Sequence, residues 1–131
     1  MTLAEVITEV EKFHNAFGIK NHYKPESKLT EAEYELRFNL MKEENEEYLE
    51  AAKSGDIVEI ADALGDQLYI LCGTILRHGL QDKIVDVFQE IQRSNMSKLD
   101  IEGKPIYRED GKVMKSELYF KPNIDSILKD K

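Results

Sequence analysis

The sequence predicts an all-α protein, a four-helix bundle followed by an irregular C-terminal tail with room for one small hairpin. Two observations predict this fold. Apolar residues recur every three or four positions through most of residues 3–95, and glycines and prolines interrupt the chain repeatedly after that. A chain of 131 residues has the size of one domain. We therefore expect a single domain over residues 1–131, with a helical core over about 3–95 and a tail over about 96–131.

The first two helices each follow a threonine that has a glutamate three residues later, which is the signature of a capping box. Thr2 introduces a helix expected over residues 3–17, and Thr30 introduces a longer helix that runs to about Ser54. Residues 18–29 between them show no periodicity. They are expected to form a loop able to cover a site on the helices.

Two further helices follow a turn at Ser54 and Gly55. Asp56 is suited to cap a third helix that ends near His78, where Gly79 can terminate it. A fourth helix is expected over residues 81–94, where apolar residues again recur at helical spacing.

The tail after residue 95 loses this periodicity. Asp110 and Gly111 are a typical hairpin turn between two short apolar segments. The tail is also the main basic segment of the chain, with lysines at Lys98, Lys104, Lys112, Lys115 and Lys121.

The overall charge and hydropathy exclude several classes of protein. A net charge of -8 disfavours nucleic acid as a partner, because no basic stripe is present to meet phosphates. The N-terminus lacks a signal-peptide pattern, and no apolar run is long enough to span a membrane. We expect a cytoplasmic protein with no membrane partner. Cys72 is the only cysteine, so no disulfide is expected within the chain.

Two acidic clusters flank the turn at Ser54 and Gly55. Glu44 and Glu47 are three residues apart on the second helix, and an antiparallel return of the chain would place Asp66 level with Glu44 and Asp62 level with Glu47. Glu59 lies three residues before Asp62, on the same face of the third helix. Both acidic faces would therefore meet at one height.

Carboxylates gathered in this way need a positive partner. Two of them about 5 Å apart repel by roughly 3 kcal/mol at an effective dielectric constant near 20. No Lys or Arg interrupts either cluster, so a divalent cation is the simplest partner. Oxygen ligands without Cys or His favour a hard ion, Mg²⁺ or Mn²⁺, over zinc or copper.

The pattern EENEE, followed one helix later by EIADALGD, resembles the all-α nucleoside triphosphate pyrophosphohydrolases of the MazG-like superfamily. That superfamily includes dimeric dUTPases and phosphoribosyl-ATP pyrophosphohydrolase, and its signature is E-E-x-x-E followed by E-x-x-D. The matching residues are Glu43, Glu44, Glu47, Glu59 and Asp62. Many members carry E-x-x-D ending at the position of Asp66, where Ala63 departs from the motif, so two registers remain open.

Three further segments extend the resemblance over nearly the whole chain: FHNAFG, RSNMSKL and DGKVMKSELYFKPNI. They are similar to a phage and bacterial subgroup described as phosphoribosyl-ATP pyrophosphohydrolase-like. The resemblance implies the bundle fold of the all-α NTP pyrophosphatases, and hydrolysis of a nucleoside triphosphate to the monophosphate and pyrophosphate in nucleotide pool sanitation. It also implies a homodimer or homotetramer. The substrate stays open among dUTP, dCTP, modified nucleotides and phosphoribosyl-ATP.

The resemblance also implies roles for individual residues. Mg²⁺, or Mn²⁺ in its place, would be held by Glu44, Glu47, Glu59 and Asp62, with Asp66 as a further ligand. Glu43 and Glu47 are the catalytic candidates, Glu43 either as an outer ligand or as the carboxylate that orients and deprotonates the water. The residues expected to bind the substrate are Phe13, His14, Phe17, Asn95, Lys98, Lys112 and Lys115.

One alternative remains beside the enzyme. The acidic helices could form a non-enzymatic binding or regulatory module, in which the carboxylates serve an interface with a partner protein. Metal binding distinguishes the two, since the binding module needs none.

Overall fold

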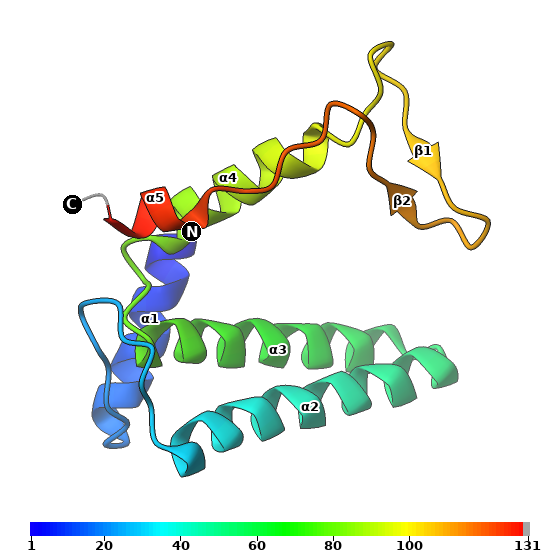
Figure 1. Ribbon diagram of the computed structural model, residues 1–131. Coiled ribbons are helices and arrows are strands. Elements are labelled where there is room, and N and C mark those ends of the chain that lie inside the picture. The colour runs from blue at the N-terminus through cyan, green and yellow to red at the C-terminus, as the bar shows by residue number, and fades with distance from the viewer. Residues whose placement is uncertain (130–131) are drawn as a thin grey trace. The chain divides into compact units, whose positions relative to one another are not determined.

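The computed structural model describes residues 1–129 of the chain, and these are mainly helical (Figure 1). The prediction of an all-α fold is confirmed. The chain divides into two compact units, Met1–Asp82 and Lys83–Lys131. The first unit contains three of the four expected helices, and the second unit contains the fourth. That all 131 residues form a single domain stays a prediction.

The first unit consists of α1 (Leu3–Ala16), α2 (Glu31–Ser54) and α3 (Ile57–Arg77). The helices α2 and α3 run antiparallel and side by side, and α1 packs against α3 (Figure 1). Thr2 and Thr30 form the predicted capping boxes at the starts of α1 and α2.

A small apolar core holds these three helices together. Its most deeply buried side chains are Val10 on α1 and Cys72 and Leu76 on α3, each no more than 1% exposed. Cys72 lies within the helical core, as its apolar surroundings predict. Small residues let α2 and α3 approach each other, since Ala51 and Ala63 are both buried.

The loop between α1 and α2 is fastened to the C-terminal end of α3. The backbone N–H of His22 donates to the Leu76 carbonyl at 2.9 Å, and that of Glu26 donates to the His78 carbonyl at 2.8 Å. Asp66 lies ten residues before Leu76, or about 15 Å along the helix. The loop is therefore bound at the end of α3 that lies away from Asp66, and the expectation that it covers a site on the helices stays a prediction.

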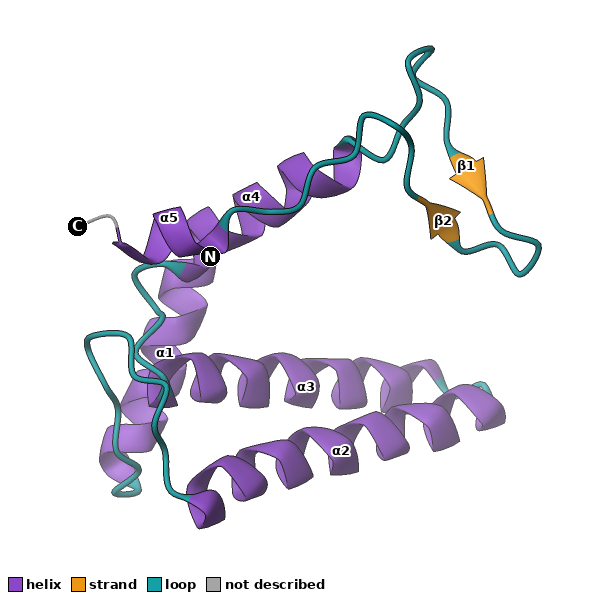
Figure 2. Cartoon of the chain, viewed as in Figure 1, coloured by secondary structure: helices purple, strands orange, loops and turns teal. Residues whose placement is uncertain are grey.

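The second unit contains α4 (Ile84–Met96), β1 (Ile106–Tyr107), β2 (Val113–Met114) and α5 (Ile124–Lys129). The strands pair antiparallel and form the predicted hairpin (Figure 2). Its turn contains Gly111 at a φ of 87°, a conformation that glycine adopts without strain. The short helix α5 was not predicted, and the expected tail extends to residues 130–131, which lie outside the described residues.

No helix within residues 1–129 is long and apolar enough to cross a membrane.

Candidate metal centre

A tight turn sets the register of α2 against α3. Gly55 adopts the left-handed conformation at a φ of 70°, and its N–H bonds to the last turn of α2. The Asp56 side chain then accepts hydrogen bonds from the N–H groups of Val58 and Glu59 and starts α3. With only two residues between the helices, residues equally far from the turn lie level with each other.

Three carboxylates meet at one level of this helix pair. One oxygen each from Glu44, Glu47 and Asp66 lies within 4.8 Å of the other two. We call these three residues the carboxylate cluster. The hairpin register predicts the meeting of Glu44 with Asp66, and the structure brings these residues together.

Glu44 is the least satisfied member of the cluster. Its Oε2 atom is buried and has no hydrogen-bond partner among the residues that the structure describes. Burial of the carboxyl group raises the pKa of Glu44 to about 7, with further contributions from Glu47 and from the charges of Asp66 and Asp62. The ionised form of Glu44 is therefore disfavoured when no cation is nearby.

The carboxylates of the cluster form no ion pair with the described residues. Within residues 1–129, none of the recorded ion pairs involves Glu44, Glu47 or Asp66. The nearest lysine in sequence to the turn, Lys53, pairs with Glu50 at 3.7 Å instead. A buried acceptor without a donor, inside a group of three carboxylates, fits a hard divalent cation such as Mg²⁺ or Mn²⁺. The residues present thus suit the ion that the sequence predicts.

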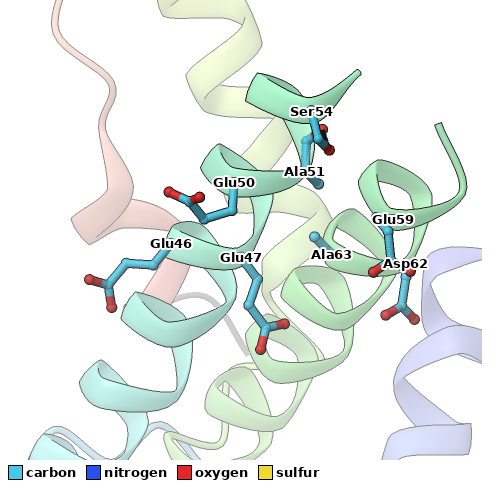
Figure 3. A pocket seen from close by; sticks show the side chains of 8 residues that line it. All are labelled: Glu46, Glu47, Glu50, Ala51, Ser54, Glu59, Asp62 and Ala63. Carbon is cyan, nitrogen blue, oxygen red and sulfur yellow. Dashed lines mark hydrogen bonds between the residues drawn. The ribbon is translucent and has the colours of Figure 1, made fainter. Parts of the chain in front are cut away.

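A hollow of about 630 Å³ adjoins the cluster. Glu47 belongs to both and extends toward α3, whereas Glu46 and Glu50 point away from that helix (Figure 3). The α3 residues that line the hollow include Glu59 and Asp62. We call this the acidic hollow, with its lining residues Glu46, Glu47, Glu50, Ala51, Ser54, Glu59, Asp62 and Ala63.

The predicted ligands therefore fall into two groups. Glu44, Glu47 and Asp66 form the close cluster, while Glu59 and Asp62 line the acidic hollow beside Glu47. Glu43 is exposed on α2, one turn before Glu47.

Aromatic side chains lie one turn along α3 from the cluster. The ring of Phe13 lies 4.4 Å from that of Phe17 and 5.5 Å from that of Tyr69, between ring centres. Tyr69 follows Asp66 by three residues, so both lie on one side of α3. These three aromatic residues, here called the aromatic cluster, remain partly exposed, with Phe17 at 69%.

His14 lies behind this surface. It is only 2% exposed, and its Nδ1 lies 2.7 Å from the Asn21 side-chain oxygen. Burial lowers the pKa of His14, the hydrogen bond to Asn21 opposes this effect, and the charges of Arg37 and Arg77 lower it further. A neutral imidazole that is this deeply buried supports the helix packing in this structure and does not reach the surface.

The remaining predicted substrate-binding residues belong to the second unit. Asn95 and Lys98 line a hollow of about 390 Å³ in that unit. Lys112 and Lys115 are exposed, and the Lys115 ammonium group lies 4.7 Å from the centre of the Tyr119 ring. These four residues therefore do not form one compact group.

The sequence prediction missed three residues next to the site. Tyr69, Arg37 and Gly73 belong to neither acidic motif, and no motif of the sequence points to them. Arg37 precedes Glu44 by seven residues, two helical turns, on the side of α2 that faces α3. A charged residue at this spacing within a buried stripe was the available signal.

Comparison with known proteins adds independent evidence. A family model described as phosphoribosyl-ATP pyrophosphohydrolase matches residues 10–95, about two thirds of the chain, including both acidic motifs. No curated protein matches. Enzymes of this family are metal-dependent pyrophosphohydrolases that act on a nucleotide triphosphate. The chain belongs to the phosphoribosyl-ATP pyrophosphohydrolase family, within the MazG-like superfamily of NTP pyrophosphohydrolases.

Proposed function

We propose that the protein hydrolyses a nucleoside triphosphate, canonical or modified, to the monophosphate and pyrophosphate. The reaction is Mg²⁺-dependent and serves nucleotide pool sanitation. The observation that carries this proposal is the carboxylate cluster of Glu44, Glu47 and Asp66, with its buried, unpartnered Glu44 oxygen. Family membership supplies the class of reaction.

The carboxylates have the charge and the spacing that a metal-bound triphosphate requires. A bound Mg²⁺ neutralises phosphate charge and lowers the pKa of a coordinated water. Glu44, Glu47 and Asp66 would hold this ion, and Glu59 and Asp62 add carboxylates on the side of the acidic hollow. Mn²⁺ has similar ligand preferences and is expected to substitute for it.

Glu43 and Glu47 are the proposed catalytic carboxylates. Glu47 lies in both the carboxylate cluster and the acidic hollow, where it can orient a water against the substrate. Glu43 is exposed one turn away and can accept a proton from that water.

The aromatic cluster is the proposed place for the nucleobase. Phe13 and Phe17 present ring surface, and Tyr69 joins them next to Asp66. Base stacking on aromatic side chains contributes about 1–3 kcal/mol per base. His14 would act indirectly, by fixing α1 and hence the orientation of Phe13 and Phe17.

Three lysines of the basic tail segment and an asparagine just before it are proposed as substrate-binding residues. The acidic hollow is lined by four glutamates and an aspartate and contains no Lys or Arg among its lining residues. Lys98, Lys112 and Lys115 carry charges suited to phosphate oxygens, and the Asn95 amide is suited to a sugar or phosphate oxygen.

A homodimer, or a homotetramer, is proposed as the working assembly. Several large apolar side chains on α2 and α3 are exposed, including Phe38 at 65%, Leu49 at 51% and Leu71 at 46%. Apolar surface of this extent is typical of a protein that packs against another copy.

The proposed function is tested by a panel of ribo- and deoxyribonucleoside triphosphates, including dUTP, dCTP, modified nucleotides and phosphoribosyl-ATP. With Mg²⁺ or Mn²⁺, at least one member should yield pyrophosphate and not orthophosphate. A complete lack of turnover across the panel with either ion would overturn the proposal. Absence of metal binding by calorimetry would then favour the non-enzymatic binding module.

A further inference from the structure

A buried arginine connects α2 to α3 two turns away from the carboxylate cluster. Arg37 is 9% exposed, and its guanidinium donates two hydrogen bonds to α3. The Nε atom donates to the Thr74 hydroxyl at 3.0 Å, and Nη2 donates to the Ile70 carbonyl at 2.8 Å. Within residues 1–129, no recorded ion pair involves Arg37. Its bonds therefore serve the helix pairing and not charge neutralisation.

The backbone of α3 is adapted to this arginine. A Cβ atom at Gly73 would lie 2.5 Å from Arg37 Nη2 and 2.9 Å from His14 Nε2. An alanine at this position would therefore force the Arg37 guanidinium or the His14 ring to move. His14 is itself held by Asn21.

Hydrogen bonds join α2 to α3 on several levels, and among the described residues none of those on the carboxylate level involves Glu44 or Asp66. Arg77 pairs with Glu33 at the open end of the helix pair. The Gln67 amide donates to the Asn45 side-chain oxygen at 3.1 Å, on the exposed side of the cluster. Glu44 and Asp66 lie on the same level as the Gln67–Asn45 contact, and the charge of Asp66 disfavours ionisation of Glu44, so the two carboxyl groups repel each other when both are ionised.

We propose that Arg37 is a positioning residue for the metal site, which holds α2 and α3 in the register that keeps Glu44 close to Asp66 against their repulsion. This inference rests on the proposed function, because the cluster is taken as the metal site. Arg37 does not touch the metal or the substrate in this proposal. It acts by keeping the carboxylates assembled before the cation binds, which lowers the cost of assembling the site.

Arginine suits this role better than lysine. Its planar guanidinium holds two donors at a fixed angle and can reach the Thr74 hydroxyl and the Ile70 carbonyl together. A lysine keeps the charge but offers no such fork. The substitution Arg37→Lys therefore separates the geometric contribution from the electrostatic one.

The first experiment is a double-mutant cycle on stability without added metal, using Arg37→Lys and Asp66→Asn. Residues this far apart usually contribute additively to the free energy of unfolding. If Arg37 opposes the carboxylate repulsion, Arg37→Lys should lower the melting temperature clearly less in the wild type than in the Asp66→Asn background, because in the wild type the loss of the two bonds also lets the repelling carboxylates move apart. Equal losses in both backgrounds would overturn the proposal, because an ordinary packing role predicts additivity.

The second experiment measures binding of Mn²⁺ by calorimetry below the melting temperature of every variant. Arg37→Lys should weaken binding about tenfold, the size of effect typical for residues that support metal ligands. Val10→Ala is the matched control, because it opens the core at a residue that is 1% exposed and lies on α1. Equal Mn²⁺ affinity of Arg37→Lys and wild type would contradict the proposal, as would an equal loss in Val10→Ala.

If Arg37→Lys does not fold, Thr74→Val provides a milder test of the same contact. Thr74→Val removes the acceptor of Arg37 Nε and leaves the arginine in place. It should show the same coupling to Asp66→Asn with a smaller amplitude, and additivity would again overturn the inference. Failure of the wild type to bind Mn²⁺ would instead refute the proposed metal site, while the stability cycle would still decide the role of Arg37.

Discussion

The interface between α2 and α3 contains charged side chains at two levels that are two helical turns apart. Only at one of these levels is the charged group hydrogen-bonded across the interface. At the first level, Arg37 is buried and bonded to Thr74 and Ile70. At the second level, Glu44 is equally part of the interface, but its Oε2 atom has no partner among the described residues. At the first level, here called the arginine level, the buried charge is hydrogen-bonded within the described residues, whereas at the second, the carboxylate level, one buried oxygen has no partner among them. This contrast distinguishes a structural polar contact from the proposed metal site.

The largest effect on activity is expected from removing a negative charge at the carboxylate level. Glu47→Gln should reduce pyrophosphate release by about a hundredfold to a thousandfold, because a metal ion contributes several kcal/mol to transition-state stabilisation. Glu35→Gln is the matched control, since Glu35 is an exposed glutamate of α2 that belongs neither to the carboxylate cluster nor to the acidic hollow. Similar rates for the two variants would refute the assignment of Glu47.

The arginine level can be disrupted by adding a methyl group next to Arg37. Gly73→Ala should destabilise the fold by about 1–3 kcal/mol, the usual range for overpacking, because the new methyl group meets Arg37 and His14. The measurement is the free energy of unfolding in denaturant. Gly65→Ala provides the control within the same helix, because its Cβ would meet nothing within 4 Å, and it should stabilise by about 0.5–1 kcal/mol. Equal effects of the two substitutions would show that the contact is looser than the structure indicates.

A smaller effect is expected at the aromatic cluster. Phe17→Ala should raise KM for the nucleotide by about tenfold with little change in kcat, because base stacking contributes about 1–3 kcal/mol. Phe38→Ala, which removes an exposed ring from α2, is the control and should leave KM unchanged. A fall in kcat alone for Phe17→Ala would argue against stacking of the base at this place.

The smallest effect is expected in the pH dependence of protein stability, which reports on the carboxylate level. The pKa of Glu44 is raised in the folded protein to about 7, so the folded state binds a proton that the unfolded state releases near pH 4.5. The stabilisation due to this proton is fully present below the unfolded pKa, declines between these values, and is absent above about pH 7.

The melting temperature without divalent cation should therefore fall more between pH 5 and pH 7.5 for the wild type than for Glu44→Gln. Saturating Mg²⁺ should reverse this loss, because the ion takes the place of the proton. Parallel pH profiles for wild type and Glu44→Gln would show that Glu44 titrates normally.

Much of the first unit could be predicted because its determinants are local. Thr2, Thr30 and Asp56 specify helix starts by bonds to residues two or three positions away, and all three caps are present. The short turn at Gly55 then specifies which residues lie level, so the meeting of Glu44 with Asp66 followed from counting residues.

Other features depend on tertiary contacts that a count of residues does not contain. The sequence motif gave Glu59 and Asp62 priority over Asp66, but rotation of α3 about its axis determines which carboxylates reach Glu44. That rotation is set by packing at Ala63 and by the bonds of Arg37, which are not local. The burial of His14 likewise depends on Asn21 and on the glycine at position 73.

The helical hairpin also has a consequence for the order of folding. Glu44 and Asp66 belong to one continuous segment, and they come together as soon as α2 and α3 close on the Gly55 turn. Closing such a local hairpin is fast compared with forming contacts between distant segments. Because the carboxylates repel, they oppose this early step, and a divalent cation present at that time removes the opposition. The ion proposed for the reaction is thus also expected to act as a folding nucleus, bound before the rest of the chain has reached its final arrangement.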